Sequence, residues 1–242
     1  MSKKNKVQSR ADRAAALLRE QQARERRRNT MVVVAVVLVM VAIIGGGFLI
    51  NAARDSSKDI DASAAGETDH GIALGDPDAP REVVIYEDFL CPYCGQLEAA
   101  SSDELARLAD EGRVYVDYRP FQLLSFDYSR DSANAFAVVL DAAGPDVAKE
   151  FHDLLFADQP SEAGPFPDSD WFVDKAVEAG ADEDDVRAGI EDGEMEDWVA
   201  DATDAAIAAG INSTPVVLLD GEIYQDGRTM EELADNLVAE LE

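Results

Sequence analysis

The stretch that decides the fold is "YEDFLCPYCGQLE", residues 86–98, in which an apolar run gives way to a helix-like pattern. It contains Cys91 and Cys94, and the 242-residue chain has no third cysteine with which either could pair. Two cysteines at this spacing have four interpretations: two unrelated structural thiols, two ligands of a metal site, a static disulfide, or a redox-active pair. The residues around the pair distinguish between them.

The composition disfavours the metal and static-disulfide interpretations. A structural zinc site needs about four ligands, and the chain has only two histidines, His70 and His152. His70 precedes the predicted domain, and His152 lies on a predicted helix, where a packed or surface position is more common than a catalytic one. We therefore expect no metal. A static disulfide can form outside the cytoplasm, but over so short a loop the chain-entropy model gives it little stabilisation.

The position of the pair favours redox chemistry. Residues 82–89 predict a strand buried on both faces, and helix-spaced residues then run from Pro92 to a break at Gly112. Cys91 lies at this junction, where unpaired N–H groups and the helix dipole stabilise a thiolate, the form that attacks a disulfide. Cys94, one helical turn further, is expected to lie deeper, so the spacing separates an exposed attacker from a shielded resolver.

The rest of the domain alternates between sheet and helix. A helix joins the strand at 82–89 to a second strand at 114–118, so these strands should be parallel. A block of helices follows, and the chain then returns to a hairpin and a capped terminal helix. The elements predicted after residue 118 are helices within 132–144, 146–158, 168–180, 183–193 and 195–209, strands at 216–219 and 222–224, and a helix capped by Thr229 and Glu232.

The first 70 residues read as a membrane anchor. Residues 1–30 carry ten Lys or Arg against three acids, and residues 31–50 carry no charge. Twenty such residues span about 30 Å as a helix, which matches a bilayer core. We predict a basic cytoplasmic tail at 1–30, a single-pass transmembrane signal anchor at 31–50, a flexible tether at 51–70 and an extracytoplasmic domain at 71–242. A cleavable signal peptide is the alternative, but its apolar core would usually be shorter, at ~7–15 residues.

The external part is strongly acidic. Residues 51–242 contain 11 basic and 47 acidic residues, a net charge of −36. Such a surface repels nucleic acid and anionic lipid, so we expect no nucleic-acid partner. A solvated surface, or adaptation to a saline medium, explains the charge more simply than an acidic binding site. The run "DEDD" at 182–185 lacks the spaced ligands and glycine of a calcium loop, and it suits the first turn of a helix.

In its motifs and in the order of its predicted elements, the chain resembles the DsbA-like thiol-disulfide oxidoreductases. These are α/β proteins whose thioredoxin fold (βαβ then ββα) is split by a helical insertion. The matching stretches are "GDPDAP" at 75–80, "YEDFLCPYC" at 86–94 and "GINSTPVVLLDG" at 210–221. The resemblance covers roughly residues 70–242 and places the insertion at about 127–210. The basic tail and single span look like the membrane-anchored actinobacterial members of this family.

The resemblance implies an enzyme that forms disulfides in exported proteins, with Cys91 attacking and Cys94 resolving. It implies no cofactor beyond the redox-active disulfide and a quinone-linked membrane reoxidant of the DsbB or VKOR type. It also implies that Thr214 and Pro215 form a cis-proline loop beside the cysteines that pairs with substrate. Two alternatives stay open: a disulfide reductase or isomerase, and a membrane-tethered metal-binding or redox-sensing module without turnover.

One departure from the family pattern concerns the resolving thiol. The position six residues before the first cysteine carries an acid in thioredoxin and in the best-known DsbA, and here it is Ile85. Proton transfer from Cys94 then needs another acceptor. The candidates are Glu87 and Asp88, unless these acids simply face solvent or cap the helix.

A second departure concerns the two residues between the cysteines, Pro92 and Tyr93, which tune the site. Tyr93 stands where strongly oxidising DsbA proteins carry histidine, so a cation near the Cys91 thiolate is missing. The negative charge of the domain further disfavours an anion there. We therefore expect a thiolate less stabilised, and a disulfide less oxidising, than in DsbA.

Overall fold

The computed structural model describes residues 70–242. The predicted tail, anchor and tether up to residue 69 lie outside these residues, and within residues 70–242 no helix is long and apolar enough to cross a membrane. The described elements are β1 (Ile72–Leu74), β2 (Glu82–Glu87), α2 (Pro92–Asp110), β3 (Tyr115–Pro120), α3 (Asp127–Ala143), α4 (Pro145–Ala157), α5 (Ser169–Ala179), α6 (Glu183–Asp192), α7 (Glu196–Ala208), β4 (Val216–Leu219), β5 (Glu222–Ile223) and α8 (Met230–Leu241).

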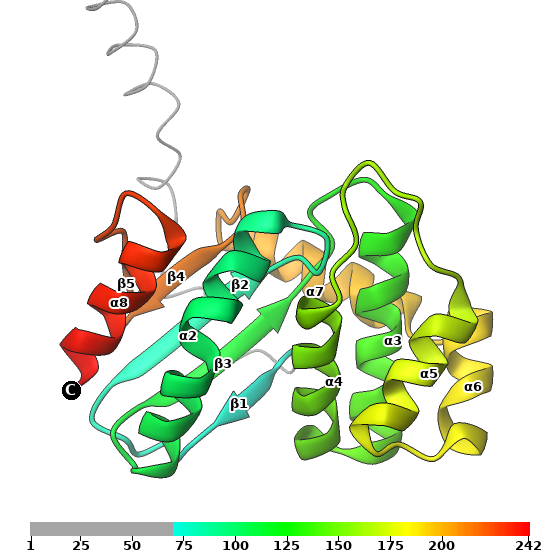
Figure 1. Cartoon of the computed structure of the whole chain (residues 1–242), viewed down its shortest axis with the longest axis horizontal. Coiled ribbons are helices and arrows are strands. Elements are labelled where there is room, and N and C mark those ends of the chain that lie inside the picture. The colour runs from blue at the N-terminus through cyan, green and yellow to red at the C-terminus, as the bar shows by residue number, and fades with distance from the viewer. Residues whose placement is uncertain (1–69) are drawn as a thin grey trace, which may run out of the picture. The chain divides into compact units, whose positions relative to one another are not determined.

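The strands form one mixed sheet in the order β1-β3-β2-β4-β5 (Figure 1). As predicted, β2 and β3 are parallel and β4 forms a hairpin with β5. β4 also pairs antiparallel with β2, which the sequence did not predict. The βαβ and ββα halves of the predicted fold are therefore confirmed. β1, which pairs antiparallel with β3, is an element that the sequence analysis did not predict, because three residues are too few to show an alternation.

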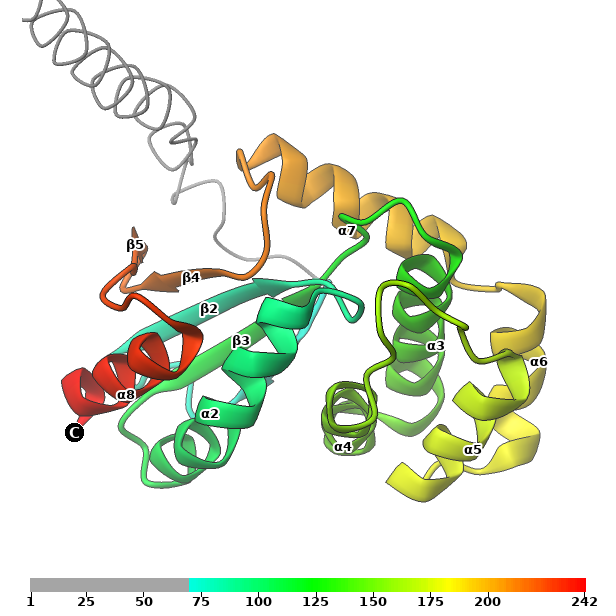
Figure 2. The ribbon, with the colours of Figure 1, turned by 45° about the horizontal axis from the view of Figure 1, so that its top comes forward.

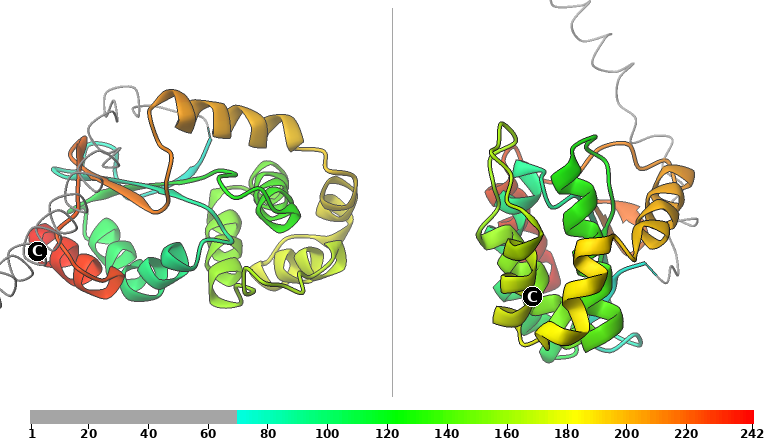
Figure 3. Two further views of the ribbon diagram at one scale, coloured as in Figure 1. Left: turned by 90° about the horizontal axis from the view of Figure 1, so that it is seen from above. Right: turned by 90° about the vertical axis from the view of Figure 1, so that its right-hand side faces the viewer.

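The central strand β2 separates two apolar cores because its side chains alternate between the faces of the sheet. Val83 and Ile85 pack in the larger core with α2, α8 and the helical block, whereas Val84 and Tyr86 pack in the smaller core with α7. Figures 2 and 3 show the corresponding layers, with α2 and α8 on one face of the sheet and α7 on the other. Burial of β2 on both faces explains its continuous apolar run.

The helical insertion comprises α3 to α7 and is entered from β3. Helices α3, α4, α5 and α6 form a block beside the sheet, and α7 returns across its face (Figure 3). Gly144 and Pro145 separate α3 from α4, at the boundary between the helices predicted within 132–144 and 146–158: Gly144 has a φ of 84°, which favours glycine, and Pro145 opens the next helix. The insertion brings α4 close to α2, the helix that follows the cysteines.

The C-terminal elements follow their turn and capping signals. Asp220 and Gly221 have φ values of 51° and 79°, as a tight hairpin turn requires. The Thr229 hydroxyl accepts a hydrogen bond from the Glu232 N–H at 3.1 Å, as predicted for the cap of α8. The Glu232 carboxylate accepts from the backbone N–H of Arg228 instead of that of Thr229, so the predicted capping box is displaced by one residue.

Candidate active site

The two cysteines lie at the start of α2, where β2 ends. Cys91 is the N-cap residue and Pro92 the first residue of the helix. The N–H groups of Cys94 and Gly95 donate to the Cys91 carbonyl at 3.0 and 3.2 Å, which fixes the first turn. Cys94 is fully buried, and Cys91 is only 6% exposed. The predicted exposed attacker is thus largely covered, since the loop before β4 lies against it.

The cis-proline loop meets Cys91 from the opposite side of the site. The Thr214–Pro215 peptide bond is cis, and the Cys91 thiol donates to the Thr214 carbonyl oxygen at 3.4 Å. A hydrogen bond from the Cys94 thiol is the main cause that lowers the pKa of Cys91 to about 6; burial opposes it, and Thr214 and the backbone N–H groups at the start of α2 support it. This value lies between about 7 for thioredoxin and about 3.5 for DsbA, in the direction that Tyr93 predicts.

Alkylation of Cys91 by iodoacetamide is expected to titrate with a midpoint at about pH 6, because the thiolate is the reactive form. The thiolate fraction should rise through this pH and stay maximal above it. Cys94→Ala removes the hydrogen bond that lowers the pKa most, so the midpoint of this variant should move upward. A wild-type midpoint below about pH 4.5, in the range of the strongest oxidants, would contradict the assignment.

A groove of about 460 Å³ opens beside Cys91. Its walls come from the start of α2, the loop after β3, the loop between α4 and α5, and the cis-proline loop. Tyr93 is 58% exposed at its edge, where it is free to contact another molecule. The lining residues are Cys91, Pro92, Tyr93, Gln96, Leu123, Leu124, Glu162, Ser213 and Thr214. The site therefore offers a mainly apolar surface next to the thiol that would attack.

Both candidate proton acceptors, Glu87 and Asp88, are fully buried, so the alternative in which they face solvent is wrong. Asp88 uses both carboxylate oxygens: Oδ1 accepts from the N–H of Leu90 at 2.9 Å, and Oδ2 accepts from Leu123 N, Leu124 N and Ser129 Oγ at 2.8, 2.9 and 2.5 Å. Asp88 thus ties the catalytic loop, residues 88–91 between β2 and α2, to the groove wall and to α3. These bonds favour an organising role for Asp88 and leave Glu87 as the better candidate acceptor.

Glu87 supplies the acid that Ile85 lacks. The two residues are two positions apart on β2, so their side chains point to the same face of the sheet. Glu87 Oε1 lies 2.5 Å from His152 Nε2, and Glu87 Oε2 is buried without a hydrogen-bond partner among the described residues. Burial is the main cause that raises the pKa of Cys94, followed by Cys91 and by the charge of Glu87. The acid on this face of β2 therefore lies at position 87, two residues after the position at which thioredoxin and the best-known DsbA carry it.

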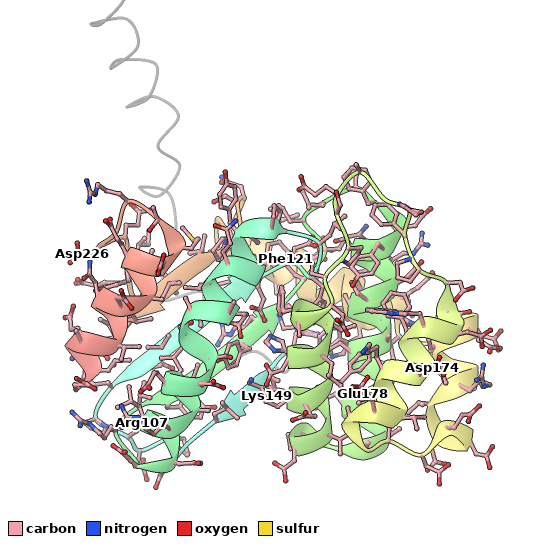
Figure 4. All side chains as sticks on the ribbon, in the orientation of Figure 1. Arg107, Phe121, Lys149, Asp174, Glu178 and Asp226 are labelled. Atoms are coloured by element: carbon pink, nitrogen blue, oxygen red, sulfur yellow. The ribbon has the colours of Figure 1, made fainter. Side chains whose placement is uncertain are left out.

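A cluster of charged groups surrounds His152, which sequence analysis treated as a packed or surface residue. His152 is fully buried, and its Nδ1 lies 2.9 Å from Asp153 Oδ1. Lys149 Nζ binds both oxygens of Asp153 at 2.5 and 2.7 Å and lies over the ring of Tyr118. In Figure 4, Lys149 lies on α4 on the side facing the sheet. One sequence signal could have indicated a charged cluster behind the cysteines: Glu98 is an acid one helical turn after Cys94, on the buried face of α2.

The same cluster is the one group of metal-type donors found among residues 70–242. Donor atoms of Glu98, His152 and Asp153 lie within 4.8 Å of one another. Both nitrogens of His152 already contact carboxylates, and the Lys149 ammonium occupies Asp153. Lys149 and His152 therefore already contact Asp153, whereas neither oxygen of Glu98 has a hydrogen-bond partner among residues 70–242, and neither cysteine belongs to the group.

Gln159, just after α4, is a second residue that sequence reasoning missed. Its side-chain amide donates to the carbonyl oxygens of Phe89 and Cys91 at 2.8 and 3.0 Å. A Cβ atom at Gly95 would approach Gln159 Oε1 to 2.7 Å, so glycine makes room for this contact. The helical insertion therefore holds the catalytic loop directly, although 68 residues separate Gln159 from Cys91.

Two thiols of unequal burial at a strand-to-helix junction, with a cis-proline loop against the outer one, define the thiol-disulfide exchange class of enzyme. A family model described as thioredoxin matches residues 67–238, and the chain belongs to this family. The chain is a thiol-disulfide oxidoreductase with a thioredoxin-like fold and a helical insertion.

The domain is similar to solved structures of DsbA and DsbG proteins. Reduced DsbG from Mycobacterium tuberculosis is 27% identical with a TM-score of 0.63, covering 75% of this chain and 90% of that one. Oxidised DsbA from the same organism is 28% identical with a TM-score of 0.59, covering 71% and 90%. The Na(+)/H(+) antiporter NhaA 1 of Salinispora arenicola is 28% identical over 181 residues, 72% of this chain, and the chain spans about a quarter of that relative.

Proposed function

We propose that the protein forms disulfides in exported proteins by exchange with a Cys91–Cys94 disulfide. The observation that carries this proposal is the arrangement of the pair: Cys91 lines an apolar groove against the Thr214 carbonyl, and Cys94 is buried behind it. Such an arrangement lets a substrate reach one sulfur only. The reaction class agrees with the DsbA and DsbG structures that the domain resembles.

In the oxidising direction, a substrate thiolate attacks Cys91 Sγ and breaks its bond to Cys94. A mixed disulfide forms between substrate and Cys91, and Cys94 leaves as a thiolate that takes up a proton. A second substrate thiolate then attacks the substrate sulfur, and Cys91 leaves as a thiolate. The substrate loses two electrons and the cysteine pair gains them. The lowered pKa of Cys91 makes it a good leaving group in the second step.

The groove suits an extended, partly apolar segment of an unfolded substrate. Leu123 and Leu124 form one apolar wall, and Tyr93 adds an exposed aromatic surface at the edge. The resemblance assigns the backbone of Thr214 to pairing with a substrate strand. A substrate held there would present its sulfur to Cys91, and the apolar walls would favour chains that have not yet buried their own core.

The proposed setting is the outer face of a cell membrane. The uncharged stretch 31–50 and the basic flank before it support a single-pass anchor with the N-terminus in the cytoplasm. After each turnover the reduced pair needs an oxidant, for which we propose a quinone-linked membrane protein of the DsbB or VKOR type. A coil of about 20 residues has a root-mean-square reach of about 25 Å, which would keep the domain near the membrane and such a partner.

A reductase or isomerase is the second candidate function, and the pKa of Cys91 favours it. Its pKa of about 6 is closer to that of thioredoxin than to that of DsbA, and a less stabilised thiolate makes a less oxidising disulfide. One of the similar structures is a DsbG. The two functions share the site and differ in the direction of electron flow.

The redox state of the cysteines in living cells tests the direction. Cells that make the full-length chain are quenched with acid, and free thiols are alkylated with a reagent that adds mass. An oxidase should have Cys91 and Cys94 mostly as a disulfide, whereas mostly dithiol would favour the reductase or isomerase. Stoichiometric copper binding by the purified protein, with no detectable exchange with a reduced peptide, would instead support the binding module without turnover.

A further inference from the structure

The buried ion pair between Glu87 and His152 joins the catalytic strand to the helical insertion. Glu87 Oε1 and His152 Nε2 are 2.5 Å apart, and both side chains are at most 1% exposed. The second oxygen of Glu87, Oε2, is buried and has no hydrogen-bond partner among residues 70–242. One oxygen of Glu87 therefore contacts His152 and the other has no partner there, while the charge of Glu87 is among the causes that raise the pKa of Cys94, after burial and Cys91.

The surroundings of His152 fix its orientation. Its ring packs against Phe89, Phe136 and Phe156 at centroid distances of 5.6, 6.4 and 5.0 Å. Its second nitrogen, Nδ1, lies 2.9 Å from Asp153 Oδ1, and the Asp153 side chain is 39% exposed. The imidazole thus points one nitrogen at the catalytic strand and the other at a carboxylate that reaches the surface.

The titratable groups facing His152 come from four elements: Glu87 from β2, Glu98 from α2, Tyr118 from β3, and Lys149 and Asp153 from α4. Burial lowers the pKa of His152, but the charge of Glu87 and hydrogen bonds with Asp153 and Glu87 outweigh it and raise the pKa to about 10. Burial, then the charge of Glu87, raises the pKa of Glu98 to about 8. Both shifts favour the protonated forms of His152 and Glu98.

We propose that His152 is a positioning residue for the resolving thiol: its contact with Glu87 Oε1 holds the carboxylate in place, with Oε2 free to accept the proton of Cys94. When a partner oxidises the pair, the Cys94 S–H bond breaks and the proton goes to Glu87. The freed thiolate then attacks Cys91 Sγ in the mixed disulfide, and the thiolate of the partner leaves. In the opposite direction Glu87 returns the proton to Cys94. The inference rests on the proposed exchange function.

The experiment follows the second step of oxidation in the full-length chain. Reduced protein is mixed with excess oxidised glutathione and quenched in acid at timed intervals, and mass spectrometry separates the glutathione mixed disulfide from the internal disulfide. In His152→Gln the mixed disulfide should persist, with the resolving step at least about tenfold slower, short of the 10²–10⁴-fold that a general base contributes. Its pH profile should move to higher pH, because a nearby positive charge favours the charged form of a carboxylate and His152→Gln removes that charge.

Matched variants separate this role from a general structural one. His70→Gln makes the same change at the other histidine of the chain and should resolve at the wild-type rate. Glu87→Gln should slow resolution more than His152→Gln, and the double variant should be no slower than Glu87→Gln, since His152 acts through Glu87. Alkylation of Cys91 should keep its midpoint in His152→Gln, because the first thiol does not use the pair.

The outcomes are distinguishable. A folded His152→Gln protein that resolves at the wild-type rate with the wild-type pH profile would overturn the inference and leave the exchange function intact. If His152→Gln does not fold, Asp153→Asn tests the same series of contacts, from Asp153 through His152 to Glu87, at its exposed end. A slower resolving step with a pH profile moved to higher pH supports the inference, and an unchanged pH profile overturns it. Wild-type protein that exchanges with no disulfide would overturn both proposals.

Discussion

Cys91→Ala is expected to lower the rate of disulfide exchange by several orders of magnitude, to the level of the uncatalysed reaction. Cys91 is the thiol that lines the groove and carries the lowered pKa, so its loss removes the nucleophile itself, as nucleophile removal does in other enzymes. Oxidation of a reduced, unfolded peptide, followed by the loss of its free thiols, measures the effect.

Cys94→Ala is the matched variant, because it removes one thiol from the same turn of α2 and keeps the attacking one. It should still form mixed disulfides through Cys91, and these should accumulate because the buried thiol that would release them is absent. Equal activity in wild-type and Cys91→Ala protein would show that the pair is not the reacting group. Mixed disulfides formed by Cys91→Ala through Cys94 would show that the assigned order of the two thiols is reversed.

Asp88→Ala is expected to lower the free energy of unfolding by about 3 kcal/mol or more, since it leaves several buried donors without an acceptor, and each such group costs about 1–3 kcal/mol. The affected groups are the N–H groups of Leu90, Leu123 and Leu124 and the hydroxyl of Ser129. Because Leu123 and Leu124 form a wall of the groove, exchange with substrate should also weaken. Urea unfolding of the full-length chain measures the first effect.

Ser129→Ala serves as the control for Asp88. It removes one of the four donors and leaves the carboxylate with the three backbone N–H groups, so its cost should be about 1 kcal/mol. Asp88→Asn, which keeps one carbonyl oxygen, should fall between the two. If Asp88→Ala costs no more than Ser129→Ala, the carboxylate does not organise the loop.

Most of the sheet, and the position of the two cysteines at the start of α2, could be predicted from the sequence because their signals are local. The apolar run of β2, the proline at the start of α2, the Asp220-Gly221 turn and the cap at Thr229 each act within a few residues, and each forms in the structure. The family resemblance added the likeness to DsbA and DsbG structures, which the comparisons confirm. Three-residue β1 was missed because its pairing with β3 depends on a distant strand.

The inner part of the site could not be predicted, because its members come from elements far apart in sequence. Glu87 and His152 are 65 positions apart, and nothing near His152 indicates that α4 packs behind the cysteines. Alternation along β2 could have distinguished Glu87 from Asp88, since Glu87 shares the face of Ile85. The exposure of Cys91 was overestimated because it depends on contact with Thr214, 123 residues away.

The contacts of Gln159 and His152 have a consequence for attempts to shorten the protein. Both residues belong to the α4 region of the insertion, yet one fastens the catalytic loop and the other balances the carboxylate beneath it. A minimal domain trimmed to the sheet, α2 and α8 would keep both cysteines and lose both supports. It would leave Glu87 without its counter-ion and uncover the face of α2 that packs against α4. The helical block and the cysteine motif are therefore a single transferable unit, and grafting experiments should move them together.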